Sequence, residues 1–169
     1  MEPKILEKDE IILIGFSFFG DPFQLSDDWT SENEIGRLWK RFFSYLGTHK
    51  SSLKHIVDPN VAYEVHIVHK ETPTTGNMDI FVGLEVKTLE DIPPRVLVKI
   101  LPATKYAVFT LVGQEITSDW GWTIYREWLP ASGYQESFPF SFQYYDQRFK
   151  GLDNIKESVL DVYIPIKDR

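Results

Sequence analysis

The alternation of hydrophobic and polar positions predicts a strand followed by a helix near the start of the chain. Residues 11–19 form a run of β-branched and aromatic side chains that is closed by a Gly-Asp-Pro turn. The apolar positions of the next segment recur at helical spacing: Ile35, Leu38, Trp39, Phe42, Phe43 and Leu46. Ser31 and Glu34 have the spacing of a capping box, and Gly47 is a suitable residue to end the helix. We therefore expect a helix over residues 32–46.

Two alternating strands complete this first succession of elements. Residues 61–68 and 79–87 both alternate with a period of two and are joined by a loop, which predicts a hairpin. Residues 88–104 form a connector in which Pro93 and Pro94 stop any regular element, with a short turn over 96–100.

The same order of elements then returns. A strand is expected at 106–112, strands at 138–145 and 160–166, and a polar loop at 146–157. Between the first two of these strands, apolar residues recur every four positions and predict a helix that ends at Leu129-Pro130: Ile116, Trp120, Ile124 and Trp128.

The fold class that follows is α+β. Two strand-helix-strand-strand units, at about 10–87 and 105–167, would form an antiparallel sheet with two helices on one face and a ligand cleft. The length of 169 residues suits one domain spanning 1–169.

Composition narrows the classes of protein that this chain could represent. It has 18 basic and 25 acidic residues, a net charge of −7, and no cysteine. The acidic balance argues against binding to a phosphate backbone, and the absence of cysteine removes disulfides and thiol nucleophiles. Aromatic residues reach 15%, which is the most unusual feature of the composition.

Motifs for catalysis, metals and membranes are missing. No signal peptide, membrane-length apolar run, phosphate loop or nucleophile elbow occurs, so we expect a cytoplasmic protein with no cofactor. His66 and His69 stand three apart in a predicted strand and would point to opposite faces, which predicts no metal site.

The predicted strands divide their residues between two faces. We expect the helices to pack on Val65, Ile67, Val82, Leu84, Phe140, Phe142, Val162 and Ile164. The opposite face would then carry Glu64, His66, Phe81, Glu85, Gln143, Tyr145, Asp161 and Tyr163. That face is either ordinary solvated surface or a pocket for a flat organic cation, because aromatic rings attract cations and a carboxylate supplies the counter-charge.

Several short motifs in the second half resemble GyrI-like effector-binding domains, the ligand-binding type found in AraC-type regulators. They are Tyr106-Ala107-Val108-Phe109, Ile124 to Gly133, Tyr145-Asp146 with Arg148-Phe149, and Asp161 to Lys167. In the first half, Ile35 to Phe43 and Phe81 to Val86 match the helix and hairpin of that family.

The resemblance implies the duplicated fold derived above and a pocket that binds lipophilic cations beside a buried acid. Relatives often carry glutamate where this chain has Gln143 and Asp161. The pocket acid would then be Glu64 or Glu85, or the ligands would be less cationic. No helix-turn-helix is predicted, so we expect a stand-alone member without direct DNA binding.

The leading hypothesis is a non-catalytic protein that senses or sequesters aromatic, cationic small molecules, alone or with a protein partner such as a regulator. The candidate binding residues are Glu64, Phe81, Glu85, Trp122, Tyr125, Gln143, Tyr145, Asp161 and Tyr163. Tyr63 is a further candidate for the pocket wall and the least favoured, because alternation places it on the other face from Glu64. One alternative is a hydrolase of cyclopropane-bearing electrophiles, using Glu64, Glu85, Asp161 or Tyr145. Another is a protein inhibitor of a DNA enzyme such as gyrase.

Overall fold

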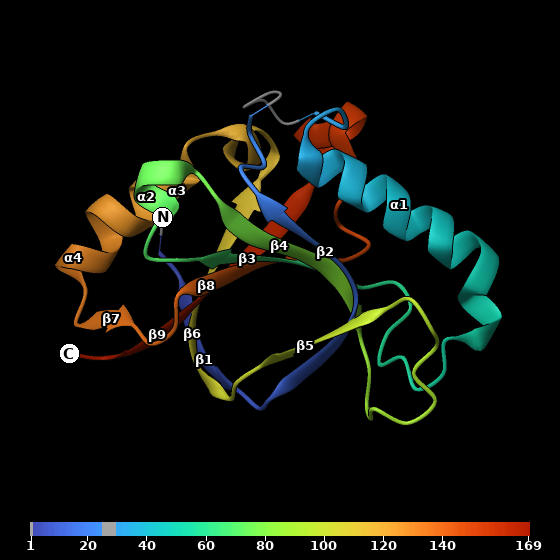
Figure 1. The fold of residues 1–169 in the computed structure, drawn as a ribbon. Coiled ribbons are helices and arrows are strands. Elements are labelled where there is room, and N and C mark those ends of the chain that lie inside the picture. Colours follow the sequence, from blue (N-terminus) through green and yellow to red (C-terminus); the bar gives the residue numbers. More distant parts are fainter. Residues whose placement is uncertain (1, 25–29) are drawn as a thin grey trace.

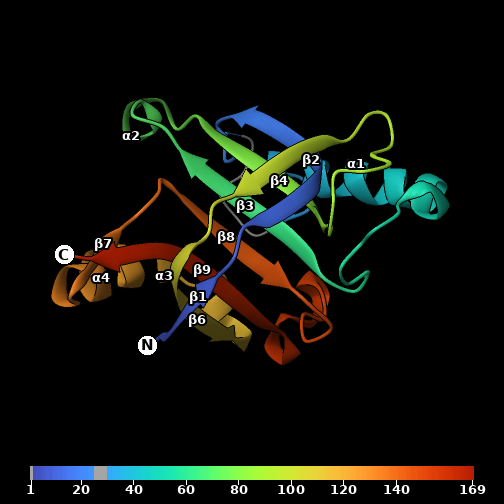
Figure 2. The same cartoon turned by 90° about the horizontal axis from the view of Figure 1, so that it is seen from below.

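The computed structural model describes residues 2–24 and 30–169, which form one strongly curved antiparallel sheet with helices on its outer face (Figures 1 and 2). Its strand order is β1-β6-β9-β8-β3-β4-β2-β5, and β7 pairs with β9. The strands are β1 (Lys4–Lys8), β2 (Ile11–Gly20), β3 (Ala62–Val68), β4 (Met78–Glu85), β5 (Leu97–Leu101), β6 (Thr104–Val112), β7 (Tyr134–Glu136), β8 (Phe140–Tyr145) and β9 (Val159–Asp168).

The two predicted units are both present, which confirms the α+β class. The first consists of β2, helix α1 (Glu34–His49), β3 and β4, and the second of β6, a helical segment over 120–131, β8 and β9. The units join where β3 pairs with β8, from Ala62 opposite Tyr145 to Ile67 opposite Phe140. This junction lies near the middle of the sheet, between the two helices (Figure 1).

Helix α1 confirms the predicted amphipathic helix but differs from it at both ends. Its N-cap is Asn33, whose side-chain oxygen accepts a hydrogen bond from the Gly36 N–H at 2.9 Å, so Ser31 is not the cap. The helix also runs through Gly47 to His49. The ring of Tyr45 stacks on His49, with centroids 4.2 Å apart, and this contact offsets the cost of about 1 kcal/mol for a helical glycine.

The second helix begins later than the sequence pattern indicates. Ile116 lies in a separate 3₁₀ helix, Gly113–Thr117. The helical segment follows it as α3 (Trp120–Trp122), a π-helical stretch (Thr123–Trp128) and α4 (Leu129–Ala131). The Asp119 carboxylate caps its start by accepting from the Trp122 N–H at 3.1 Å.

Three strands and several short helices among the described residues were not predicted from the sequence. β1 pairs with β6, β5 pairs with β2 where a turn was expected, and β7 pairs with β9. The predicted loop at 146–157 contains a 3₁₀ helix, Leu152–Glu157, and further short helices occupy Lys50–Ser52 and Thr72–Thr75. Each missed strand is short and pairs with a distant partner, so local periodicity could not reveal it.

The register corrects the predicted division of the sheet into one apolar and one polar face. Glu64 lies opposite Val82 and Gln143, and Gln143 lies opposite Val162, so these residues share the outer, helix-bearing face. The concave inner face instead carries Val65, Ile67, Phe81, Glu85, Phe140, Phe142, Asp161 and Tyr163. Both faces are buried, because the inner one packs on itself and the outer one under the helices.

Candidate ligand-binding site

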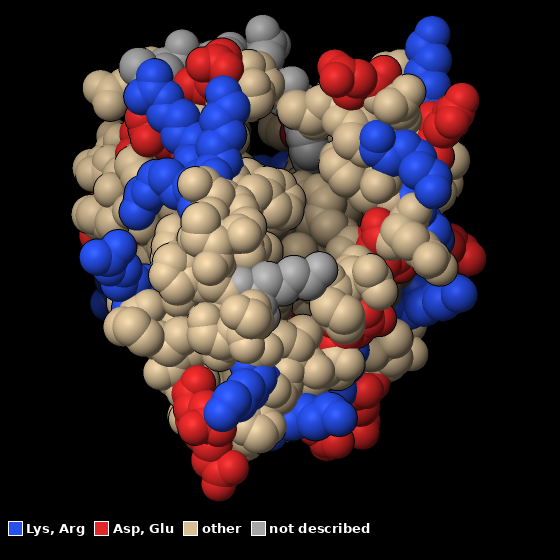
Figure 3. Space-filling model, turned by 90° about the vertical axis from the view of Figure 1, so that its right-hand side faces the viewer, with Lys and Arg blue, Asp and Glu red and all other residues tan. Residues whose placement is uncertain are grey.

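A cavity of about 800 Å³ lies on the outer face, between α1 and the start of the second helical segment. Its floor comes from β3 and β8, where the two units join. Figure 3 shows a hollow on the side that carries α1, walled mostly by uncharged side chains, with charged ones around it. The volume is within the range of small-molecule pockets.

The walls of the cavity are largely aromatic. Trp39 stacks on Phe43 with centroids 5.3 Å apart, and it meets Tyr145 edge-to-face at 5.4 Å. Tyr145 in turn meets Phe149 edge-to-face at 4.8 Å. These four rings come from α1, β8 and the loop after β8, and Trp120 adds a fifth from α3. The cavity therefore presents π faces and edges from both halves of the chain.

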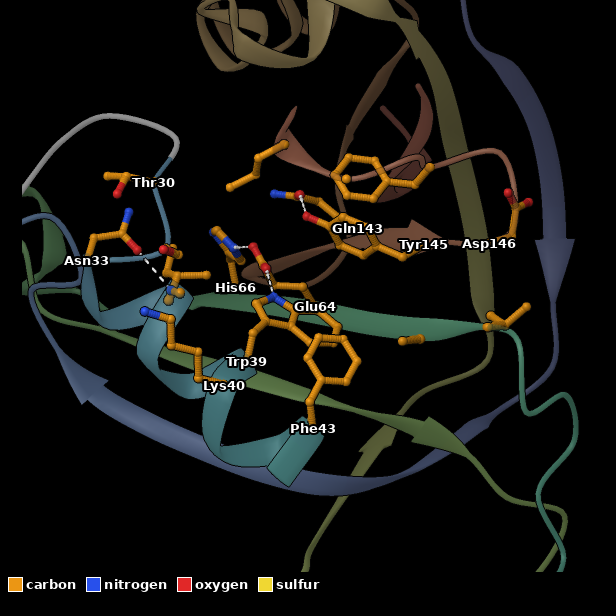
Figure 4. Close-up of a pocket in the computed structure, with 18 of the residues that line it drawn as sticks. Thr30, Asn33, Trp39, Lys40, Phe43, Glu64, His66, Gln143, Tyr145 and Asp146 are labelled. Carbon is orange, nitrogen blue, oxygen red and sulfur yellow. Dashed lines mark hydrogen bonds and ion pairs between the residues drawn. The ribbon is translucent and has the colours of Figure 1, made fainter. Parts of the chain in front are cut away.

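Glu64 supplies a buried carboxylate in this cavity (Figure 4). Glu64 is 3% exposed, and each of its carboxylate oxygens has a hydrogen-bond donor. Oε2 accepts from Trp39 Nε1 at 2.5 Å, and Oε1 pairs with His66 Nε2 at 2.7 Å. Burial of a carboxylate is costly unless it is hydrogen-bonded, and these two partners hold its oxygens in place.

Gln143 and Tyr145 form a second polar pair beside Glu64. The Tyr145 hydroxyl donates to Gln143 Oε1 at 2.6 Å (Figure 4). Burial, together with the nearby Glu64 carboxylate, raises the pKa of Tyr145 well above its ordinary value. The phenol therefore stays neutral, and Glu64 is the acid that is buried deepest among the residues lining this cavity.

The other charged residues around the cavity have partners near its mouth. Lys40 pairs with Glu32 at 2.7 Å, and both side chains are exposed. Asp146 pairs with Arg148 at 2.8 Å. Asp119 caps α3 through the bond described above. These groups border the solvent, so they contribute less to the field inside the cavity than a desolvated carboxylate does.

The structure brings three of the nine candidate binding residues to this cavity: Glu64, Gln143 and Tyr145. Four others lie on the inner face of the sheet, because β4 and β9 keep their expected phase relative to the helices while β3 and β8 are reversed: Phe81, Glu85, Asp161 and Tyr163. Trp122 and Tyr125 lie on the helical segment and do not line the cavity.

The two candidate carboxylates on the inner face have partners of their own. Glu85 accepts from the Tyr63 hydroxyl at 2.5 Å, and burial together with this carboxylate raises the pKa of Tyr63. Asp161 accepts from Thr110 Oγ1 at 2.6 Å and from Arg148 at 2.5 Å. The first contact joins β3 to β4, and the others join β9 to β6 and to the loop after β8.

The remaining candidate aromatics pack elsewhere. Tyr163 stacks on Phe142 in the inner core, with centroids 4.4 Å apart, and Phe81 is fully buried there. Tyr125 packs into the core beneath the second helical segment, where burial raises its pKa. Trp122 is 58% exposed, with the guanidinium of Arg126 over its ring at 5.9 Å.

Sequence reasoning missed the aromatic walls that α1 and the loop after β8 provide. Trp39 and Phe43 belong to the apolar stripe of α1, which made them look like core residues. The sequence did offer one sign of the wall: the apolar stripe is wide, and Phe43 lies at its edge. In the structure Phe43 is 58% exposed. Phe149 follows a strand without any periodicity, so nothing local indicated its place.

Among the described residues, no helix is long and apolar enough to cross a membrane. Over the same part of the chain, no three His, Asp or Glu side chains gather closely enough to hold a metal ion.

A curved antiparallel sheet with an aromatic cavity between two helices is suited to a ligand-binding module. The sequence comparison agrees with that class: residues 4–166 match the family described as Cass2, integron-associated effector binding protein. The chain belongs to this family, and its expected resemblance to GyrI-like domains is confirmed.

Known relatives include regulators and small ligand-binding proteins. The chain is 32% identical to the transcriptional regulator BrlR of Pseudomonas aeruginosa over 98% of its length, and it spans 56% of that protein. Its fold is similar to that of SAV2435 bound to tetraphenylphosphonium, with a TM-score of 0.71, 16% identity, and coverage of 99% and 94% of the two chains. The integron cassette protein Cass2 of Vibrio cholerae superposes with a TM-score of 0.62 and 15% identity, covering 99% and 97%.

Proposed function

We propose that this protein binds lipophilic, aromatic organic cations in the cavity between α1 and the second helical segment, as a sensor or sequestering module. The observation that carries the proposal is the burial of the Glu64 carboxylate in this cavity. A carboxylate that is 3% exposed and set among aromatic side chains offers a bound cation a counter-charge that water screens only weakly.

The walls support the same class of ligand. An aromatic face attracts a desolvated cation by about 0.5–2 kcal/mol, and this cavity offers several rings around one acid. Its volume of about 800 Å³ leaves room for a ligand with several aryl groups. The relative SAV2435 was solved with tetraphenylphosphonium, a cation of this kind.

Three probes of similar aryl chemistry and different charge test the proposal. Tetraphenylphosphonium is cationic, triphenylphosphine oxide is neutral, and tetraphenylborate is a shape-matched anion. Each is titrated into the protein while tryptophan fluorescence is followed, because Trp39 and Trp120 line the cavity.

We expect saturable quenching by the cation, with a Kd at least about tenfold below that of the neutral probe, which corresponds to about 1.4 kcal/mol. We expect no saturable response to the anion. Equal affinity for the cation and the neutral probe, or tighter binding of the anion, would show that Glu64 does not select charge.

A further inference from the structure

His66, which pairs with the buried Glu64 carboxylate, is itself a titratable group. His66 Nε2 lies 2.7 Å from Glu64 Oε1, and the two side chains are 17% and 4% exposed. A carboxylate oxygen only accepts hydrogen bonds, so Nε2 carries a hydrogen and the charge of the ring depends on Nδ1. With a neutral ring the pair has a net charge of −1, and with a protonated ring it has a net charge of zero.

We propose that His66 acts as an internal counter-cation, so that an organic cation entering the cavity displaces a proton from its ring. This inference rests on the proposed function and adds its regulation. A cation near Glu64 shares the field of that carboxylate with the imidazolium, and two like charges beside one acid repel each other. The bound state therefore favours the neutral ring, and the proton passes from Nδ1 to solvent.

The surroundings of His66 favour it as the group that responds. Trp39 Nε1 occupies the second oxygen of Glu64 but carries no charge in either state. Among the described residues, the other charged or titratable ones that line the cavity are Lys40, Asp119, Tyr145 and Asp146. Tyr145 is held neutral, Lys40 and Asp146 are paired at the mouth, and Asp119 caps a helix. Histidine is the side chain whose ordinary range falls between about pH 5 and pH 8.

The consequence is an affinity for cations that rises with pH. Where the free protein holds a proton that the complex lacks, the Kd falls by up to about tenfold for each unit of pH. The affinity becomes constant once His66 is neutral in the free protein. A neutral aryl ligand does not compete with the imidazolium, so its affinity changes little over the same range.

Calorimetry with tetraphenylphosphonium tests this inference. Titrations at about pH 5 to pH 8, in buffers of different ionisation enthalpy, give the number of protons released. We expect up to one proton released per cation bound, and none for triphenylphosphine oxide. The variant His66→Gln keeps an N–H donor for Glu64 and does not titrate, so it should bind the cation without proton release. His69→Gln is the matched control, because His69 pairs with Asp79 at 2.8 Å outside the cavity and its loss should leave the proton release intact.

Proton NMR of the histidine ring provides a readout that does not depend on a variant folding. The ring signal lost in His66→Gln identifies His66; if that variant does not fold, nuclear Overhauser contacts to Trp39 identify it in the native protein. We expect its midpoint to move to lower pH when the cation is bound.

The outcomes separate the two proposals. Cation binding that is independent of pH, or proton release that persists in His66→Gln, would overturn the role of His66 and leave the proposed function standing. Absence of cation binding at every pH would overturn both.

Discussion

Replacing Glu64 by Gln is the sharpest perturbation of the proposed binding site. The change keeps the size of the side chain and removes its charge. Glu85→Gln is the matched control, since Glu85 accepts one hydrogen bond of 2.5 Å from Tyr63, just as Glu64 accepts one of 2.5 Å from Trp39. Glu85 lies on the inner face of the same sheet, outside the cavity.

The size of the effect follows from Coulomb's law. The aryl groups of tetraphenylphosphonium keep its charge about 6–8 Å from a carboxylate, and at an effective dielectric constant of about 20 the attraction is about 2–3 kcal/mol. Glu64→Gln should therefore raise the Kd for the cation by about 30- to 150-fold. The Kd for triphenylphosphine oxide should change by less than about threefold, because a neutral ligand gains little from the charge.

Isothermal titration calorimetry at about pH 8, where an ordinary histidine is neutral, measures both constants. Circular dichroism and urea unfolding establish that the two variants keep their fold. An equal loss of affinity for the cationic and neutral ligands would refute the role of the charge. So would a loss in Glu85→Gln as large as that in Glu64→Gln.

Three further predictions test the wall, the cap of α1 and the buried phenols. Phe43→Ala should weaken cation binding by about 2- to 30-fold, or about 0.5–2 kcal/mol, because its ring lines the cavity. Since Phe43 is 58% exposed, the free energy of unfolding in urea should change by only about 0.5 kcal/mol. An unaltered Kd in calorimetry would contradict its place in the wall. Asn33→Ala should lower the free energy of unfolding by about 0.5–2 kcal/mol, because the Gly36 N–H loses its acceptor; an unchanged urea midpoint would show that the cap contributes nothing. Burial raises the pKa of Tyr163 to about 12, above its ordinary value of about 10, so the stability from its neutral form is complete below about pH 10 and is lost as pH rises toward 12. The urea midpoint should fall over that pH range, and it should fall less in Tyr163→Phe. If every tyrosine of the still folded protein showed phenolate absorbance at about pH 10, the prediction would be wrong.

The sequence alone determined the class of fold and most of its elements. The apolar stripe from Ile35 to Leu46 predicts α1, and the alternating segments predict β3, β4, β6 and β9 to within a few residues. These elements follow from local periodicity, because a helix or strand must present its apolar side chains on one side. The resemblance to effector-binding domains rested on short motifs in the right order, and the family match confirms it.

The register of the folded sheet sets which residues share one of its faces. Alternation shows that two sets of side chains point in opposite directions, but it does not fix the phase of one strand against the next. Phe142 faces the inner core while Val162 faces the second helix, although both were expected on one face. Because both faces of this curved sheet are buried, hydrophobicity could not distinguish them.

The candidate site depends on the same tertiary decision. Glu64 was recognised as a candidate acid from its strand, but its partner Trp39 comes from a helix 25 positions earlier and Tyr145 from the other half of the chain. Pairing of β3 with β8 brings Glu64 opposite Gln143, and pairing of β3 with β4 sets Glu64 opposite Val82, which leaves Glu85 on the other face. The sequence therefore determined the kinds of residue available for a pocket. The register of the strands and the packing of α1 determined which of them meet, because those depend on contacts between residues far apart in the chain.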